Sequence, residues 1–81
     1  MAKAFPKNDL SLSETIEQIE KITGEVEEGR SFIQSIGRDG TVKADHYYHG
    51  TDFTVRLFTV NDVVGYYSIT SPDGKYDYSS I

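Results

Sequence analysis

The segment Asp45–Asp52 contains both histidines of the chain and has an aspartate at each end. Histidine and aspartate side chains bind metal ions and transfer protons, so this segment is the first candidate for chemistry. A metal site needs side chains that converge on one point, but His46 and His49 are an odd number of positions apart and would point to opposite faces of a strand. Asp52 could rejoin His49 across the following turn. The segment therefore predicts no more than a weak metal or ligand site at His46, His49 and Asp52.

Other kinds of catalysis have little support in the sequence. The chain has no cysteine and no Gly-x-Ser-x-Gly elbow that would expose a nucleophilic serine. Carboxylates that could pair for acid and base chemistry lie beside expected turns, where aspartate is favoured for backbone reasons; they are Asp45, Asp52, Asp62 and Asp73. We expect a non-enzymatic protein without a cofactor. The competing hypothesis is a small metal-binding or ligand-binding protein, or an enzyme, that uses the Asp45–Asp52 segment.

Negative charge is concentrated in one part of the chain. The 81 residues carry a formal net charge of −5, and the stretch from Glu14 to Glu28 has six glutamates against the single base Lys21. Nucleic-acid binding depends on clustered lysine and arginine, so the acidic balance argues against direct contact with nucleic acid. A basic protein, or the basic groove of a nucleic-acid-binding protein, is the better electrostatic match. Glu14, Glu17 and Glu20 are candidate residues for such a contact.

These residues would be positioned by one helix near the N-terminus. Ser11 and Glu14 have the spacing of a capping box, and Gly24 is a typical helix stop. Apolar residues recur at helical spacing between them, at Leu12, Ile16, Ile19 and Ile22. The pattern predicts a helix over residues 11–24, after a flexible N-terminus at residues 1–10.

The rest of the chain reads as short aromatic and β-branched strands separated by turns of two to four residues. The expected strands are 30–36, 41–48, 53–60, 63–70 and 75–79. Residues 25–29 are either a charged linker or the first part of an edge strand through Val26, and we expect a linker. Such short turns join strands that are neighbours in the sheet. The sequence therefore predicts a single α+β domain over residues 1–81, with the N-terminal helix packed on a four- to five-stranded antiparallel β-meander at residues 30–79.

Alternation along the strands leaves apolar groups on both faces of this sheet. In the fourth strand we expect Val63 and Tyr67 on one face and Val64 on the other. The third strand is apolar on both faces, or has a bulge near Leu57. One helix of about three turns covers only one face. The uncovered face would carry some of Tyr47, Phe58, Val60, Val64 and Tyr66, of which Tyr47, Phe58 and Tyr66 are candidate protein-binding residues.

Several features together indicate the class of function. The absence of cysteine agrees with a reducing compartment, and no apolar run has the length of a signal peptide or a membrane span, so we expect a cytoplasmic protein without a membrane partner. The main hypothesis is a small acidic protein-binding module that acts through an aromatic sheet face and an acidic helix. In size, acidity and plan the chain resembles the accessory and inhibitor proteins of phages and mobile elements. A homodimer, or a purely structural homo-oligomer subunit, is the remaining alternative.

Overall fold

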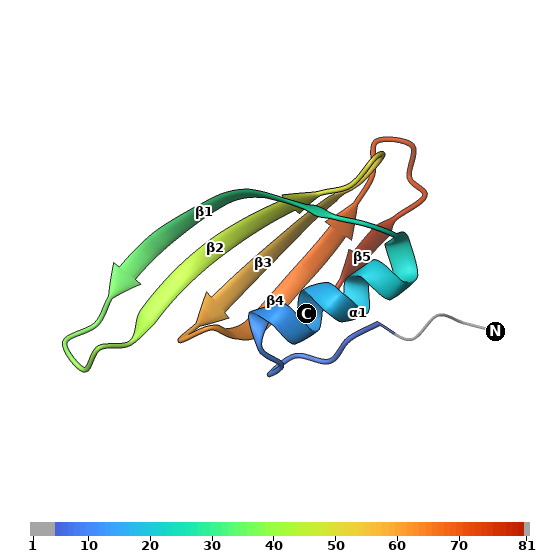
Figure 1. Cartoon of the computed structure of the whole chain (residues 1–81). Helices are drawn as coiled ribbons and strands as arrows, with labels where there is room; N and C mark the ends of the chain where they lie inside the picture. The colour runs from blue at the N-terminus through green and yellow to red at the C-terminus, as the bar shows by residue number, and fades with distance from the viewer. Residues whose placement is uncertain (1–4, 81) are drawn as a thin grey trace.

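The computed structural model describes residues 5–80 and contains one helix and one five-stranded antiparallel sheet (Figure 1). The elements are α1 (Leu12–Thr23), β1 (Glu27–Ile36), β2 (Val42–His49), β3 (Thr54–Val60), β4 (Val63–Thr70) and β5 (Asp77–Ser79). The strands pair in chain order from β1 to β5, which agrees with the predicted meander. Within residues 5–80, no helix is long and apolar enough to cross a membrane.

Helix α1 begins and ends where the local sequence signals predicted. The Ser11 hydroxyl oxygen accepts a hydrogen bond from the backbone N–H of Glu14 at 3.2 Å, and the hydroxyl donates to the Glu14 carboxylate at 2.9 Å. Gly24 closes the other end with a φ of 95°. Ile19, in the predicted apolar stripe, is fully buried. Thr15 is also fully buried, and its hydroxyl is satisfied because it donates to the Ser11 carbonyl at 2.9 Å.

The pairing register divides the strand residues between two faces, because directly opposed residues of antiparallel strands point the same way. The core face carries the fully buried Val55, Leu57, Val64, Tyr67 and Ile69. Ile19 of α1 belongs to the same hydrophobic cluster. The opposite face, called the open face below, carries Phe32, Lys43, Asp45, Tyr47, Arg56, Phe58, Val60, Val63 and Tyr66.

Strand β4 departs from strict alternation at Gly65. This residue is skipped in the pairing with β3, so β4 has a bulge there, a position at which glycine is common. The bulge moves Val64 to the core face, where it is fully buried beside Tyr67, and leaves Val63 on the open face with 41% exposure. The prediction for Val63 and Val64 was therefore wrong. The apolar groups of β3 lie on both faces, and the register shift between Phe58 and Thr59, close to Leu57, arises from the extra residue Gly65 in β4 and not from β3 itself.

Strand β1 begins earlier than predicted. Residues 25–29 were expected to be a linker, but β1 starts at Glu27, which pairs with His49 at the end of β2. Glu27 and Glu28 show no apolar alternation, so this boundary depends on the partner strand and not on local pattern. As a result β1 is ten residues long, and every one of them is exposed.

Residues 9–10, expected to belong to a flexible N-terminus, run along the edge of β4. The backbone N–H of Asp9 donates to the Val64 carbonyl, and the N–H of Val64 donates to the Leu10 carbonyl, both at 2.8 Å. Ser11 then forms a bridge with Val63. This segment occupies the part of the β4 edge that β5 does not reach, because β5 pairs only with residues 68–70. Residues 1–4 lie outside the described part of the chain.

Tyr67 connects this segment to the core and makes the stability of the fold depend on pH in the alkaline range. Its hydroxyl donates to the Pro6 carbonyl at 2.5 Å, and burial raises the pKa of Tyr67, with a further contribution from Tyr78. Because the unfolded chain ionises Tyr67 near pH ~10 while the folded chain keeps it neutral, the free energy of unfolding is expected to fall as the pH rises above that value. Tyr67→Phe should lose about 1–2 kcal/mol at neutral pH, since the Pro6 carbonyl loses its donor.

Urea unfolding at a series of alkaline pH values measures both effects. The Tyr67→Phe protein should show a shallower decline than the original protein above pH ~10. Some decline should remain, because burial and Glu28 also raise the pKa of Tyr48. Equal slopes in the two proteins would contradict the assignment to Tyr67.

Candidate functional site

The structure places His46 on the core face in a hydrogen-bonded setting. Its Nδ1 lies 3.1 Å from the Ser31 hydroxyl, and its Nε2 lies 3.0 Å from the Thr59 hydroxyl. Both ring nitrogens are therefore engaged with β1 and β3. A metal ion could bind His46 only by displacing one of these hydroxyls.

His49 lies at the exposed end of β2, away from His46. Its Nε2 is 3.5 Å from the Glu27 carboxylate, and the two side chains line a shallow depression of about 250 Å³. Asp52 and His49 both line a second depression of about 330 Å³ beside the adjacent turns. Among residues 5–80, no group of three or more histidine, aspartate or glutamate side chains is placed to hold a metal ion. The segment thus brings His49 and Asp52 to one region but leaves His46 apart from them.

Two of the aspartates beside the turns accept hydrogen bonds from the backbone. Asp39 accepts a hydrogen bond from the N–H of Thr41, and Asp73 accepts one from the N–H of Lys75, each at 3.0 Å. These backbone hydrogen bonds hold the pKa of both carboxyl groups below the usual range. Such contacts are typical of Asx turns.

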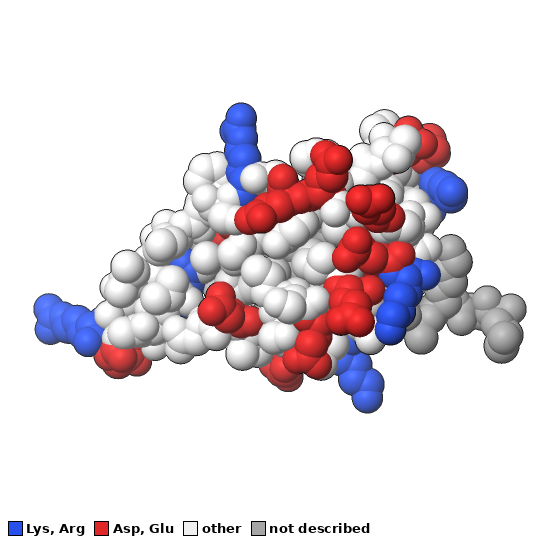
Figure 2. Space-filling model, in the orientation of Figure 1, with Lys and Arg blue, Asp and Glu red and all other residues white. Residues whose placement is uncertain are grey.

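Acidic side chains gather on the face of the molecule where α1 lies. Figure 2 shows them over α1 and the neighbouring end of the sheet, with lysine and arginine mainly at the periphery of this view. The acidic residues of these elements are Glu14, Glu17, Glu20, Glu25, Glu27 and Glu28, of which all but the half-buried Glu20 are exposed. The predicted candidates Glu14, Glu17 and Glu20 therefore share one helix with exposed acidic neighbours.

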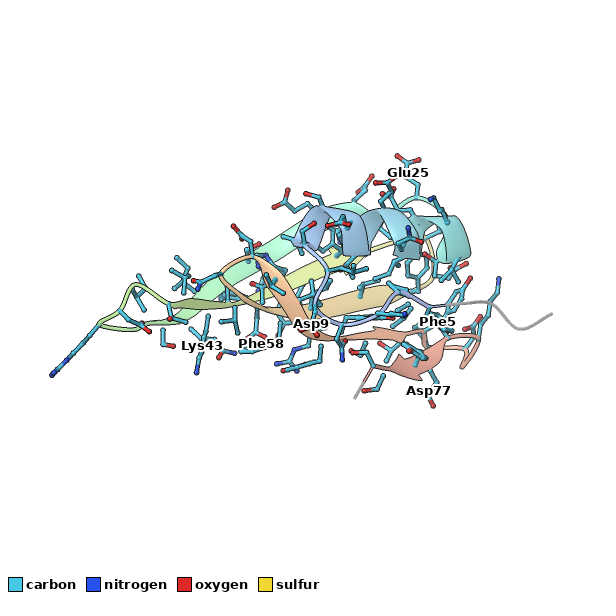
Figure 3. The ribbon with its side chains drawn as sticks, turned by 90° about the horizontal axis from the view of Figure 1, so that it is seen from below. Phe5, Asp9, Glu25, Lys43, Phe58 and Asp77 are labelled. Carbon is cyan, nitrogen blue, oxygen red and sulfur yellow. The ribbon has the colours of Figure 1, made fainter. Side chains whose placement is uncertain are left out.

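The open face holds the predicted aromatic candidates. Phe58 and Tyr66 are directly opposed on β3 and β4, and their rings are stacked with centroids 5.2 Å apart. Both residues are half-buried. Figure 3 shows Phe58 and Lys43 on the side of the sheet away from α1. The two stacked rings form an aromatic pair that is partly accessible on this side.

Tyr47 links this surface to the sheet edge. Its ring makes an edge contact with Phe32 of β1, with centroids 6.1 Å apart, and Arg56 lies over it with the guanidinium carbon 5.6 Å from the ring centre. Phe32 is 51% exposed. The open face is thus a row of aromatic side chains with an accessible guanidinium, a composition typical of protein interfaces.

Asp45 is buried in the middle of this face. Its side chain is 9% exposed, and it lies directly opposite Phe58 on one side and Phe32 on the other. Gln34 donates a hydrogen bond to its Oδ2, and Arg56 Nη2 is 3.8 Å from Oδ1. Within residues 5–80, Oδ1 has no hydrogen-bond partner although it is buried. A buried carboxylate between two phenylalanines is costly, so this contact with Arg56 matters for the stability of the face.

Sequence reasoning missed several residues of these surfaces. It did not place Asp45 among the aromatic side chains, although aspartate inside an otherwise aromatic and β-branched strand is unusual and could have drawn attention to it. It also missed the exposed apolar residues of β1, which are Phe32, Ile33 and Ile36. Their exposure depends on β1 being the edge strand, which a single strand's sequence does not reveal.

Comparison with known proteins gave no relative: no protein-family model, no curated protein and no solved structure matches the chain.

Proposed function

We propose that this protein is a non-enzymatic protein-binding module of the cytoplasm whose docking surface is the open face. The observation that carries this proposal is the stacked, half-buried Phe58–Tyr66 pair on the side of the sheet away from α1. Tyrosine and phenylalanine contribute large contact areas and lose little entropy on binding. With Arg56 over Tyr47, the face presents the residue types that most often dominate binding energy in protein interfaces.

In this proposal α1 packs on the core face, and the open face is therefore left for a partner. Support comes from Ile19, which is fully buried in one cluster with Leu57 and Tyr67. Further support comes from the helix start, where the N–H of Leu12 donates to the Asp62 carbonyl in the β3–β4 turn at 3.0 Å. These contacts support a position of α1 over β3 and β4, on the side opposite Phe58.

A basic partner fits the charge of the molecule best. The exposed glutamates of α1 and of residues 25–28 would attract such a partner and speed its approach, while the aromatic face would hold it. A small protein of this kind can act as an inhibitor or accessory factor by covering a surface of its target. This is the role expected of the phage and mobile-element proteins that the chain resembles.

The test is affinity capture of a partner from host lysate, followed by measurement of its Kd with purified variants. Tyr66→Ala should weaken binding by about 30-fold or more, the effect of losing a ~2 kcal/mol hot spot, and Phe58→Asp should weaken it further by adding a buried charge. Thr51→Asp is the control, because it adds the same charge to an exposed residue of the β2–β3 connection, outside the open face. Circular dichroism confirms that each variant is folded.

The same complex measured at low and moderate salt separates the two surfaces. Binding that weakens with salt, and weakens again in a Glu17→Lys, Glu20→Lys double variant, would support a basic partner on the acidic surface. A salt-independent complex would remove the acidic surface from the proposal. Unchanged affinity in both Tyr66→Ala and Phe58→Asp would overturn the open face as the docking surface.

A further inference from the structure

His46 is the centre of a chain of hydrogen bonds that the proposed function does not use. Its Nδ1 lies 3.1 Å from the Ser31 hydroxyl, and its Nε2 lies 3.0 Å from the Thr59 hydroxyl. Thr59 is buried, and its hydroxyl donates to the Ala44 carbonyl at 3.5 Å. Ser31, at the other end of the chain of hydrogen bonds, is exposed. An exposed hydroxyl, an imidazole beside it and a third group that orients the imidazole form the arrangement that activates a nucleophile.

The Thr59 hydroxyl determines which ring nitrogen of His46 carries the proton. A hydroxyl has one proton to donate, and Thr59 donates it to the Ala44 carbonyl. The Thr59 oxygen therefore accepts a hydrogen bond from the Nε2–H of His46. Nδ1 keeps its lone pair and accepts a hydrogen bond from the Ser31 hydroxyl. Neutral His46 is thus held in the tautomer whose basic nitrogen faces the serine.

A register shift in β1 brings Ser31 opposite His46. Glu28 pairs with Tyr48, and regular antiparallel pairing from that point would place Arg30 opposite His46. The shift between Glu28 and Ser31 adds one residue to β1, so the serine takes this position instead of the arginine. Bulges of this kind often redirect a side chain at a functional site.

We propose that Ser31 is an acyl acceptor, which takes the acyl group of an activated ester or thioester with His46 as its general base. The Ser31 oxygen attacks the carbonyl carbon, and the hydroxyl proton passes to Nδ1 of His46. The bond from that carbon to the leaving group then breaks, and the leaving alcohol or thiol takes the proton from His46. The products are an ester at Ser31 and a neutral imidazole.

This reaction is separate from the proposed docking function. It modifies the protein once and does not turn over, so the chain is the acceptor and not an enzyme. Ser31 and His46 are opposed on the core face, whereas Phe58 and Tyr66 lie on the open face. The acyl acceptor and the docking surface can therefore fail or succeed independently.

The edge position of β1 gives the acyl donor access to Ser31. All ten residues of β1 are exposed, and among the described strands β1 pairs with β2 alone. Successive backbone N–H groups of a strand point to alternate edges, so either residue 31 or residue 32 has its N–H on the free edge. An N–H at this place can donate to the carbonyl oxygen as negative charge develops on it.

Acetylation by p-nitrophenyl acetate tests the assignment at pH ~8, where imidazole groups are largely neutral. Peptide mapping by mass spectrometry follows each site. Ser31 should be acetylated at least about 100-fold faster than Ser35, another exposed serine of β1, for which the structure of residues 5–80 shows no histidine contact. Hydroxylamine removes an ester from serine but leaves an amide on lysine, which separates these products. Equal rates at Ser31 and Ser35 would overturn the proposal.

Variants of His46 and Thr59 test the role of each residue. His46→Gln should slow the acetylation of Ser31 by about 100-fold or more, because the amide does not take the proton. Thr59→Val should slow it by about 10-fold or more, since Nε2–H loses its acceptor, whereas Thr59→Ser keeps a hydroxyl and should restore the rate. Circular dichroism confirms that each variant is folded. An unchanged rate in His46→Gln would show that His46 is not the base, and equal rates in Thr59→Val and Thr59→Ser would show that Thr59 is not a positioning residue.

Discussion

Replacing Ile19 with alanine is expected to lower the free energy of unfolding by about 2–5 kcal/mol. Ile19 is fully buried and contributes to one cluster with Leu57 and Tyr67 of the sheet, so its loss leaves a cavity in that cluster. An 81-residue domain has only about 4–12 kcal/mol in total, so the variant should be close to unfolding at 37 °C. Urea denaturation followed by circular dichroism measures the change.

Lys21→Ala provides the control in the same helix. Lys21 is exposed, so its replacement should change stability by less than about 0.5 kcal/mol. A loss below about 1 kcal/mol for Ile19→Ala would show that α1 adds little by packing on the sheet. In that case the core face would itself be poorly covered, and the distinction between core face and open face would lose its main support.

Features fixed by a few neighbouring residues could be predicted from the sequence. The helix boundaries depend on the Ser11 cap and on Gly24, and both signals act within one turn of the chain. The strand bounds of β4 also agree, because the two-residue turn before it is marked by Asn61 and Asp62, which both have positive φ in the structure.

Features that depend on a distant partner could not be predicted. Glu27 belongs to β1 because it pairs with His49, more than twenty residues away, and the charged run around it fits a linker as well as a strand. The bulge at Gly65 is a property of the β3–β4 pair, and it exchanges the faces of Val63 and Val64. Alternation within one strand assumes a regular ladder, and therefore gave the wrong answer at this point.

The same division applies to the candidate surfaces. Tyr47, Phe58 and Tyr66 lie on one face because side chains alternate regularly along β2 and β3, and because Tyr66 comes after the bulge at Gly65. The exposure of Ile33 follows only from the edge position of β1, which is a property of the whole sheet. Asp45 was recognised as a polar residue of interest, but the sequence associated it with the histidines rather than with Arg56.

Arg56→Ala is expected to destabilise the protein by about 1–3 kcal/mol, because it removes the cation nearest to the buried carboxylate of Asp45. A fully buried pair would cost more, but the Arg56 side chain is 48% exposed and the attraction is partly screened by water. In an Asp45→Asn background, which has no buried charge to leave unpaired, the same change should cost only about 0.5–1 kcal/mol. That remainder is the contact between Arg56 and the Tyr47 ring.

The double-mutant cycle separates these two contributions of Arg56. A coupling of about 1–2 kcal/mol between positions 45 and 56 would assign most of the effect to the carboxylate. If Arg56→Ala costs the same stability in the original chain and in Asp45→Asn, the effect belongs to the contact with the Tyr47 ring. That result would contradict a stabilising pair between Asp45 and Arg56. Tyr47→Leu is the control, since it removes the ring and keeps both charges, and the coupling between Asp45 and Arg56 should survive it. A coupling that disappears with the ring would mean that Tyr47 positions the guanidinium beside Asp45, so that the aromatic row and the buried carboxylate of the open face form one unit.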